Sequence, residues 1–285
     1  METSQRTIDA VFRFAPPGHF YSPHSSIDDV DHSYSEWSAR LRNIPGLDIC
    51  AELQIRLVDT ARCQGLLGDW TDAAGGNRRY HFENMFFRFG DAQALFALAG
   101  IFRPARVIEV GCGYSTACWL DSIERIGLST SLTCVEPYPD RLEQLLSAQD
   151  LAGRVQLLRC PVQDVSLEYF DALQENDVLF IDSTHVAKAG SDVIYLLFQV
   201  IPRLRSGVLV HFHDVFWPFE YPKTWLLEGR SWNEAYLLRA FLTFNSAFEI
   251  VRLNSFLATE LPDIFASQDR RFLTDHGASI WLRKR

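Results

Sequence analysis

Residues 109–116 read EVGCGYST and place two glycines among small residues, between two different hydrophobic patterns. The residues before them, ARVI (105–108), form an apolar run typical of a buried strand. The residues after them, TACWLDSIERIG (116–127), have the three- and four-residue spacing of an amphipathic helix. A strand, a glycine loop and a helix in this order predict the first unit of a parallel α/β sheet.

The chain continues this alternation of apolar runs and amphipathic segments to its end. Further strands are expected at 131–136, 154–160, 177–182 and 207–212, which are nearly continuous in apolar residues, as strands buried on both faces are. Helices are expected at 140–150 and 191–204, and another from Ser231, whose S-x-x-E spacing to Glu234 fits a capping box. The pattern predicts an α/β fold with a doubly wound, mostly parallel sheet. The runs 248–253 and 278–284 are candidates for an antiparallel pair at its edge.

The amino-terminal third differs from the rest of the chain in its residue composition. Aromatic residues and prolines cluster in FRFAPPGHFYSP (12–23) and MFFRFG (85–90), with one expected helix between them at 51–67. Such a segment cannot easily bury a core of its own, so we expect residues 1–90 to cover residues 91–285 as a cap.

Composition narrows the classes of partner and compartment. A formal charge of −9 disfavours nucleic acid, because proteins that bind it present a basic face. No apolar run reaches the length of a membrane span, and the first residues, METSQRTIDA, lack the order of a secretion signal. The six cysteines form no CxxC pair, which favours free thiols over disulfides or a zinc site. We therefore expect a cytoplasmic protein without nucleic-acid or membrane partners, and the sequence leaves a homo-oligomer open.

Polar residues gather where the expected strands end. The carboxyl ends of parallel strands share one edge of a sheet, and ligands bind there. Five of the expected strands bring Glu109, Glu136, Gln163 with Asp164, Asp182 with His185, and His213 with Asp214 to that edge. Some of these residues have simpler explanations: Glu136 and Asp164 suit turns or caps, and His211, on the same face as His213, suits a hydrogen-bonded core position.

The glycine loop departs from the dinucleotide fingerprint G-x-G-x-x-G. Thr116 stands in place of the third glycine, and Glu109 precedes Gly111 by two residues, where an acid would repel a pyrophosphate. A ligand with a sulfonium and an amino group suits carboxylates at strand ends, and its own carboxylate suits the start of a helix. Glu136, 25 residues after Gly111, suits the hydroxyls of a ribose. The ligand we infer is S-adenosylmethionine.

These residues resemble a known family. EVGCGYST, VE136, FIDSTH (180–185) and GVLVHFHD (207–214) are similar to the class I S-adenosylmethionine-dependent methyltransferases, above all a small-molecule subfamily with D-x-x-H and H-D at strand ends. The resemblance spans residues 80–285 and implies a seven-stranded, Rossmann-like sheet in the order 3-2-1-4-5-7-6 with the seventh strand antiparallel. It also implies contacts to the cofactor: the methionine moiety near Glu109, Gly111 and Gly113, the ribose near Glu136, and the adenine near Gln163 and Asp164. Ser115 and Asp182 complete the implied cofactor-binding residues. Ser115 departs from the third glycine of many relatives.

The same resemblance implies catalytic residues: Asp182, His185 and His213. Asp182, His213 and Asp214 are similar in position to the metal ligands of catechol-type and sugar O-methyltransferases, except that His213 replaces a carboxylate. Magnesium prefers oxygen ligands alone, whereas imidazole suits manganese, iron or zinc, and the sequence leaves open whether any metal binds. His185 is expected as the general base or as a metal ligand, with a structural loop histidine as the alternative.

The expected function is transfer of a methyl group to a small-molecule acceptor, at a hydroxyl oxygen, in natural-product or sugar tailoring. Tyr21, Trp217 and Tyr221 are candidates to line the acceptor pocket, or alternatively to attach the cap to the core. Three alternatives stay open: methylation of nitrogen or carbon, a protein that only binds the cofactor, and an iron oxygenase with His185, His213 and Asp214 as ligands.

Overall fold

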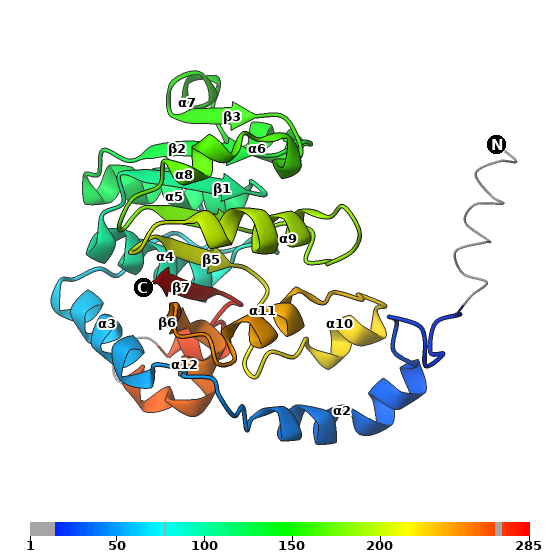
Figure 1. Cartoon of the computed structure of the whole chain (residues 1–285). Coiled ribbons are helices and arrows are strands. Elements are labelled where there is room, and N and C mark those ends of the chain that lie inside the picture. Colours follow the sequence, from blue (N-terminus) through cyan, green and yellow to red (C-terminus); the bar gives the residue numbers. More distant parts are fainter. Residues whose placement is uncertain (1–14, 77, 266–269) are drawn as a thin grey trace, which may run out of the picture.

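A computed structural model describes residues 15–76, 78–265 and 270–285. Its centre is one seven-stranded sheet in the order β3-β2-β1-β4-β5-β7-β6, with helices on both sides and β7 antiparallel to both neighbours (Figure 1). This confirms the predicted fold class, the strand order and the antiparallel edge pair. The strands are β1 Arg106–Val110, β2 Ser131–Val135, β3 Val155–Leu158, β4 Val178–Ile181, β5 Leu209–Phe212, β6 Phe248–Leu253 and β7 Ile280–Lys284.

The central strands are buried on both faces, as their apolar sequences predict. Every residue of β4 and β5 is buried, and β1 is buried after its first residue. Polar side chains inside this layer are therefore exceptions that need partners. His211 of β5 is one: its ring stacks on Phe180 at a centroid distance of 3.6 Å, and its Nε2 lies 3.0 Å from Ser279 Oγ. His211 is thus a core residue.

Two of the predicted helices are interrupted or distorted in the structure. The segment 140–150 divides into α6 and α7, because Leu146 is extended and Ser147 caps α7 by accepting from the Asp150 N–H. Helix α9 continues through a π-helical turn, Leu196–Val200, into Ile201–Arg203. The helices are α2 Ile27–Leu41, α3 Ala51–Cys63, α4 Phe89–Phe102, α5 Tyr114–Ile126, α6 Asp140–Leu145, α7 Ala148–Gly153, α8 Leu167–Asp171, α9 Asp192–Tyr195, α10 Lys223–Leu227, α11 Glu234–Leu242, α12 Asn254–Glu260 and α13 Arg271–Thr274.

Helix α4 was not predicted from the sequence. It is apolar around most of its circumference, and its residues from Phe89 to Gly100 are all buried. A helix without a polar face has no 3.6-residue alternation, so periodicity cannot detect it. The capping box predicted at Ser231 and Glu234 is wrong for a different reason. Helix α11 begins at Glu234 after Asn233, without a side-chain cap, and Ser231 Oγ instead hydrogen-bonds His24.

The amino-terminal segment packs on the sheet domain. Along the lower edge of Figure 1, α2 lies against α10, where Tyr34 Oη donates to the Tyr221 carbonyl (2.9 Å) and Lys223 Nζ lies 2.8 Å from Asp31. Helix α3 packs on α4 and β6, and the side chains of Trp70 and Tyr80 belong to the main core. The division into residues 1–90 and 91–285 stays a prediction, as does the cytoplasmic location. Residues 1–14 lie outside the described part.

One ion network fixes the loop before α4. The Arg79 guanidinium lies 2.7 Å from Asp121 of α5, 3.0 Å from Glu124 of α5 and 2.7 Å from Asp150 of α7. Hydrogen bonds from Arg79 hold the pKa of Asp150 at about 2. Among the described residues, no helix is long and apolar enough to cross a membrane.

Candidate active site

The carboxyl ends of β1, β2, β4 and β5 open into a cavity of about 580 Å³. A second hollow of about 420 Å³ adjoins it, and both contain Gly111, Glu136 and the segment 182–184 in their walls. Most of the strand-end residues predicted from the sequence therefore meet at one place. Together the two hollows have the size of a site for a ligand and a second small molecule.

Gly111 lets the first loop pass close to the end of β4. Its φ of +82° is in the left-handed region, and a Cβ on it would stand 1.7 Å from the Asp182 carbonyl oxygen. Only glycine tolerates both conditions. Gly113 and Ser115 follow it in the wall of the larger cavity, so three of the residues predicted to contact the cofactor line this cavity.

Glu109 lies beneath this loop and does not line either hollow. Its side chain is 0% exposed, and Thr116 Oγ1 donates to its Oε2 (2.6 Å) while accepting from the Gly113 N–H (3.1 Å). Burial raises the pKa of Glu109 to about 7. The expectation that Glu109 touches the methionine moiety is therefore not supported, because this carboxylate supports the start of α5 from inside.

Glu136 faces both hollows, as Asp182 does. Its Oε2 accepts from the Cys112 N–H (3.2 Å) and its Oε1 from the Tyr138 N–H (2.9 Å), so its orientation is fixed by the backbone. Gln163 lines the smaller hollow and donates to the Gly190 carbonyl (2.9 Å). Asp164, by contrast, is exposed and lies outside both walls.

Asp182, His185 and Asp214 form a compact group at the floor of the larger cavity. Their ligand atoms lie within 4.8 Å of one another, and His185 Nε2 is 3.5 Å from both Asp182 Oδ1 and Asp214 Oδ2. His185 and Asp214 have φ values of 59° and 57°, which non-glycine residues adopt at a cost and which the fold must enforce. The predicted third member, His213, adjoins the group, with Nδ1 3.6 Å from Asp182 and 3.3 Å from Asp214.

Glu234 is a member of the site that the sequence did not reveal. Its buried carboxylate lies 3.0 Å from His185 Nδ1, which turns Nε2 toward the two aspartates. Burial opposes a charge on His185, but the hydrogen bonds to Asp182 and Glu234 raise its pKa to about 10. The S-x-x-E spacing gave Glu234 a local explanation, whereas its partner is 49 residues away in the chain.

Asp91 has the same relation to His213. It lies near the start of α4, is buried, and places Oδ2 3.3 Å from His213 Nε2. Its Oδ1 accepts from the Ala278 N–H (2.9 Å) and from Asn254 Nδ2 (3.2 Å). Burial would lower the pKa of His213, yet the charges of Asp214 and Asp182 raise it well above its usual value. Each imidazole of the site is thus held from behind by a buried carboxylate.

Residues 108–215, which contain this rim, match the family model described as a methyltransferase domain. The chain therefore contains a methyltransferase domain. An uncharacterized protein of Archaeoglobus fulgidus is 30% identical over 180 residues, which are 61% of this chain and 79% of that protein.

Two solved structures are also similar to the chain. One is a methyltransferase of Podospora anserina with bound S-adenosylhomocysteine, at 15% identity and a TM-score of 0.46, covering 90% of this chain and 96% of that one. The other is the O-methyltransferase TomG of Streptomyces achromogenes, at 14% identity and a TM-score of 0.43, covering 81% and 89%.

Aromatic rings wall the methyltransferase cavity on two sides. Trp225 and Trp232 meet edge to face at 5.2 Å, and the Arg230 guanidinium lies over both rings, 4.4 and 5.2 Å from their centres. A second aromatic pair also lines the cavity, because Phe86 stacks on Tyr114 with ring centres 6.0 Å apart. Neither tryptophan was predicted as a pocket residue.

The three aromatic residues that were predicted there lie elsewhere in the methyltransferase. Tyr21 is 67% exposed and outside the cavity wall. Trp217 packs edge to face on Phe256 and donates its Nε1–H to Glu260 (2.8 Å). Tyr221 is buried, and its hydroxyl accepts from the Ala235 N–H (3.0 Å). Trp217 and Tyr221 therefore serve packing, the alternative that their sequence context left open.

Proposed function

We propose that this methyltransferase transfers the methyl group to a hydroxyl oxygen of a small molecule bound beside Asp182, His185 and Asp214. One observation carries the proposal: this group opens into the same cavity as the glycine loop and Glu136. The methyl donor and the acceptor group would thus meet in one enclosed space. Alignment and exclusion of water are the main requirements of a displacement at carbon.

A divalent metal suits this group of side chains. Two atoms about 2.1 Å from one ion, at angles of 90 to 110°, lie about 3.0 to 3.4 Å apart, close to the 3.5 Å between His185 Nε2 and each aspartate. We therefore propose His185 in place of His213 as the third ligand. One imidazole with two carboxylates suits manganese, iron or zinc better than magnesium. A bound ion would lower the pKa of the acceptor hydroxyl and orient it.

The protein side chains have separate parts in this proposal. Glu136 accepts hydrogen bonds from the ribose, and Gly111 and Gly113 leave room for the methionine portion. Trp225 and Trp232 exclude water and hold the acceptor by its apolar part. His213 is the imidazole left to take up the acceptor's proton, and Glu234 and Asp91 fix the orientation of His185 and His213.

The test combines product formation with metal removal. The protein is incubated with S-adenosylmethionine and a panel of phenols, catechols and sugars, and release of S-adenosylhomocysteine is measured before and after dialysis against a chelator. We expect turnover to fall on dialysis and to return with manganese, iron or zinc. Asp214→Asn should lower metal affinity by about 10- to 100-fold or more, whereas Asp263→Asn, at an exposed position, should change nothing.

Two results would contradict different parts of the proposal. Turnover that survives both chelation and Asp214→Asn would contradict the proposed role of a metal ion. Tight binding of S-adenosylhomocysteine without product from any hydroxyl acceptor would favour a nitrogen or carbon acceptor, or a protein that only binds the cofactor.

A further inference from the structure

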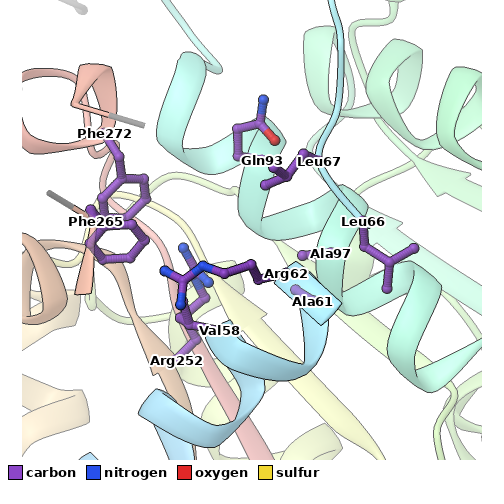
Figure 2. Close-up of a pocket in the computed structure, with 10 residues that line it drawn as sticks. All are labelled: Val58, Ala61, Arg62, Leu66, Leu67, Gln93, Ala97, Arg252, Phe265 and Phe272. Atoms are coloured by element: carbon purple, nitrogen blue, oxygen red, sulfur yellow. The ribbon is translucent and has the colours of Figure 1, made fainter. Parts of the chain in front are cut away.

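Apart from the two hollows of the candidate active site, a smaller cavity lies between α3, α4 and β6, away from the residues of the catalytic rim. Its volume is about 50 Å³. Figure 2 shows its walls: apolar side chains from α3 and α4 on one side, two stacked phenylalanines on another, and the guanidinium groups of Arg62 and Arg252 between them. Leu67, at the rim, is 49% exposed, so the cavity reaches the surface there.

Arg252 brings a buried positive charge to this cavity. It projects from β6, is 6% exposed, and its Nε donates to Asn254 Oδ1 (2.7 Å). Its guanidinium carbon lies 5.2 Å from the centre of the Phe272 ring. No carboxylate in the described residues lies within ion-pair distance of it. Burial lowers its pKa to about 10, although the charge of Asp91 opposes this from farther away. A buried charge without a counter-ion is costly, so the site favours an anion.

The neighbouring polar groups do not supply that anion. The carboxylate of Asp91 lies against His213 and also accepts from Asn254, so its charge is shared with the active site. The Gln93 amide is satisfied by both backbone groups of Gly68, at 2.9 and 2.6 Å. Arg62 adds a second cation, which Asp59 holds at 2.7 Å.

We propose that this cavity binds a small carboxylate anion with a short apolar chain, with the carboxylate on Arg252 and the chain against Phe265 and Phe272. A planar guanidinium matches the two oxygens of a carboxylate. Because Asp59 already holds Arg62, only one of the two arginines in these walls lacks a carboxylate of the described residues within ion-pair distance, which is too little positive charge for a phosphate dianion. The volume has room for about three to five water-sized groups, which corresponds to acetate and propionate. This site is independent of the proposed methyl transfer.

Calorimetric titration of the full-length protein with sodium acetate, propionate, butyrate and hexanoate tests the proposal. Affinity should rise from acetate to propionate and then fall as the chain exceeds the cavity. Propionamide, which has the same shape without charge, should not bind. A crystal soaked with 3-bromopropionate should show anomalous bromine density beside Phe265 and Phe272.

Variants of Arg252 separate this site from other binding. Arg252→Met should keep the packing and lower propionate affinity at least tenfold, and Arg252→Lys, which retains the charge, should lower it less. Arg203→Met, at an exposed arginine paired with Asp171, should leave the affinity unchanged. The proposal is overturned if no acid of the series binds, if Arg252→Met and Arg252→Lys bind propionate as the parent does, or if the bromine lies elsewhere.

Discussion

Gly111→Ala is the substitution whose consequence follows most directly from the coordinates. The new Cβ would stand 1.7 Å from the Asp182 carbonyl oxygen, roughly half of an ordinary contact distance. An alanine at a φ of +82° adds about 1 to 2 kcal/mol, and forced repacking adds about 1 to 3 kcal/mol. The free energy of unfolding should therefore fall by about 2 to 5 kcal/mol, which a protein of ordinary stability survives.

Cofactor binding should fall as well. Relief of the contact must move either the glycine loop or the end of β4, and both form the walls of the cofactor cavity. Urea unfolding measures the first effect, and calorimetric titration with S-adenosylhomocysteine measures the second, for which we expect a loss of about 100-fold.

Gly153→Ala is the matched control for this substitution. A Cβ at Gly153 would meet nothing within 4 Å, so its stability should stay within about 1 kcal/mol of the parent and its cofactor affinity should not change. If Gly111→Ala kept the stability and the affinity of Gly153→Ala, the close approach of β1 and β4 would be wrong.

Three further perturbations test the groups around the site. Glu234→Gln removes the charge behind His185, so turnover should fall about 10- to 100-fold with S-adenosylhomocysteine affinity retained; equal losses in both measurements would make Glu234 merely structural. Arg79→Met leaves Asp121 and Asp150 without their cation, and urea unfolding at pH 7 should show a loss of about 3 kcal/mol, which shrinks below pH 4 as the carboxylates take up protons. Because the pKa of Glu109 is raised from 4.5 to about 7 in the folded state, its ionisation costs stability progressively as pH rises from 4.5 to 7. Glu109→Gln should therefore match the parent near pH 4.5 and exceed it by up to about 3 kcal/mol at pH 8; an equal difference at both pH values would refute this.

The local pattern of the chain was sufficient to predict the sheet and its functional edge. Apolar runs identify strands because both faces of a parallel sheet are buried, and the ends of such strands meet at one edge whatever the loops do. Gly111, Glu136, Asp182 and His213 could therefore be placed at one cavity before any coordinates were known, and the structure brings them there. The buried position of Glu109 was missed because the strand was expected to end at this residue, whereas β1 continues to Val110 and keeps the side chain of Glu109 inside the sheet layer.

Tertiary structure alone decided which side chains face one another from distant parts of the chain. The partners Asp91 and His213 are 122 residues apart, and Glu234 and His185 are 49 apart. No local spacing encodes such pairs, and in Glu234 a local capping pattern suggested the wrong partner. The aromatic wall shows the same limit, since Trp225 and Trp232 line the cavity whereas Trp217 and Tyr221 pack elsewhere. Hydrophobic patterning fixes how each segment is buried, but the partners of a buried charge depend on how the segments pack together, and that is settled only in the folded chain.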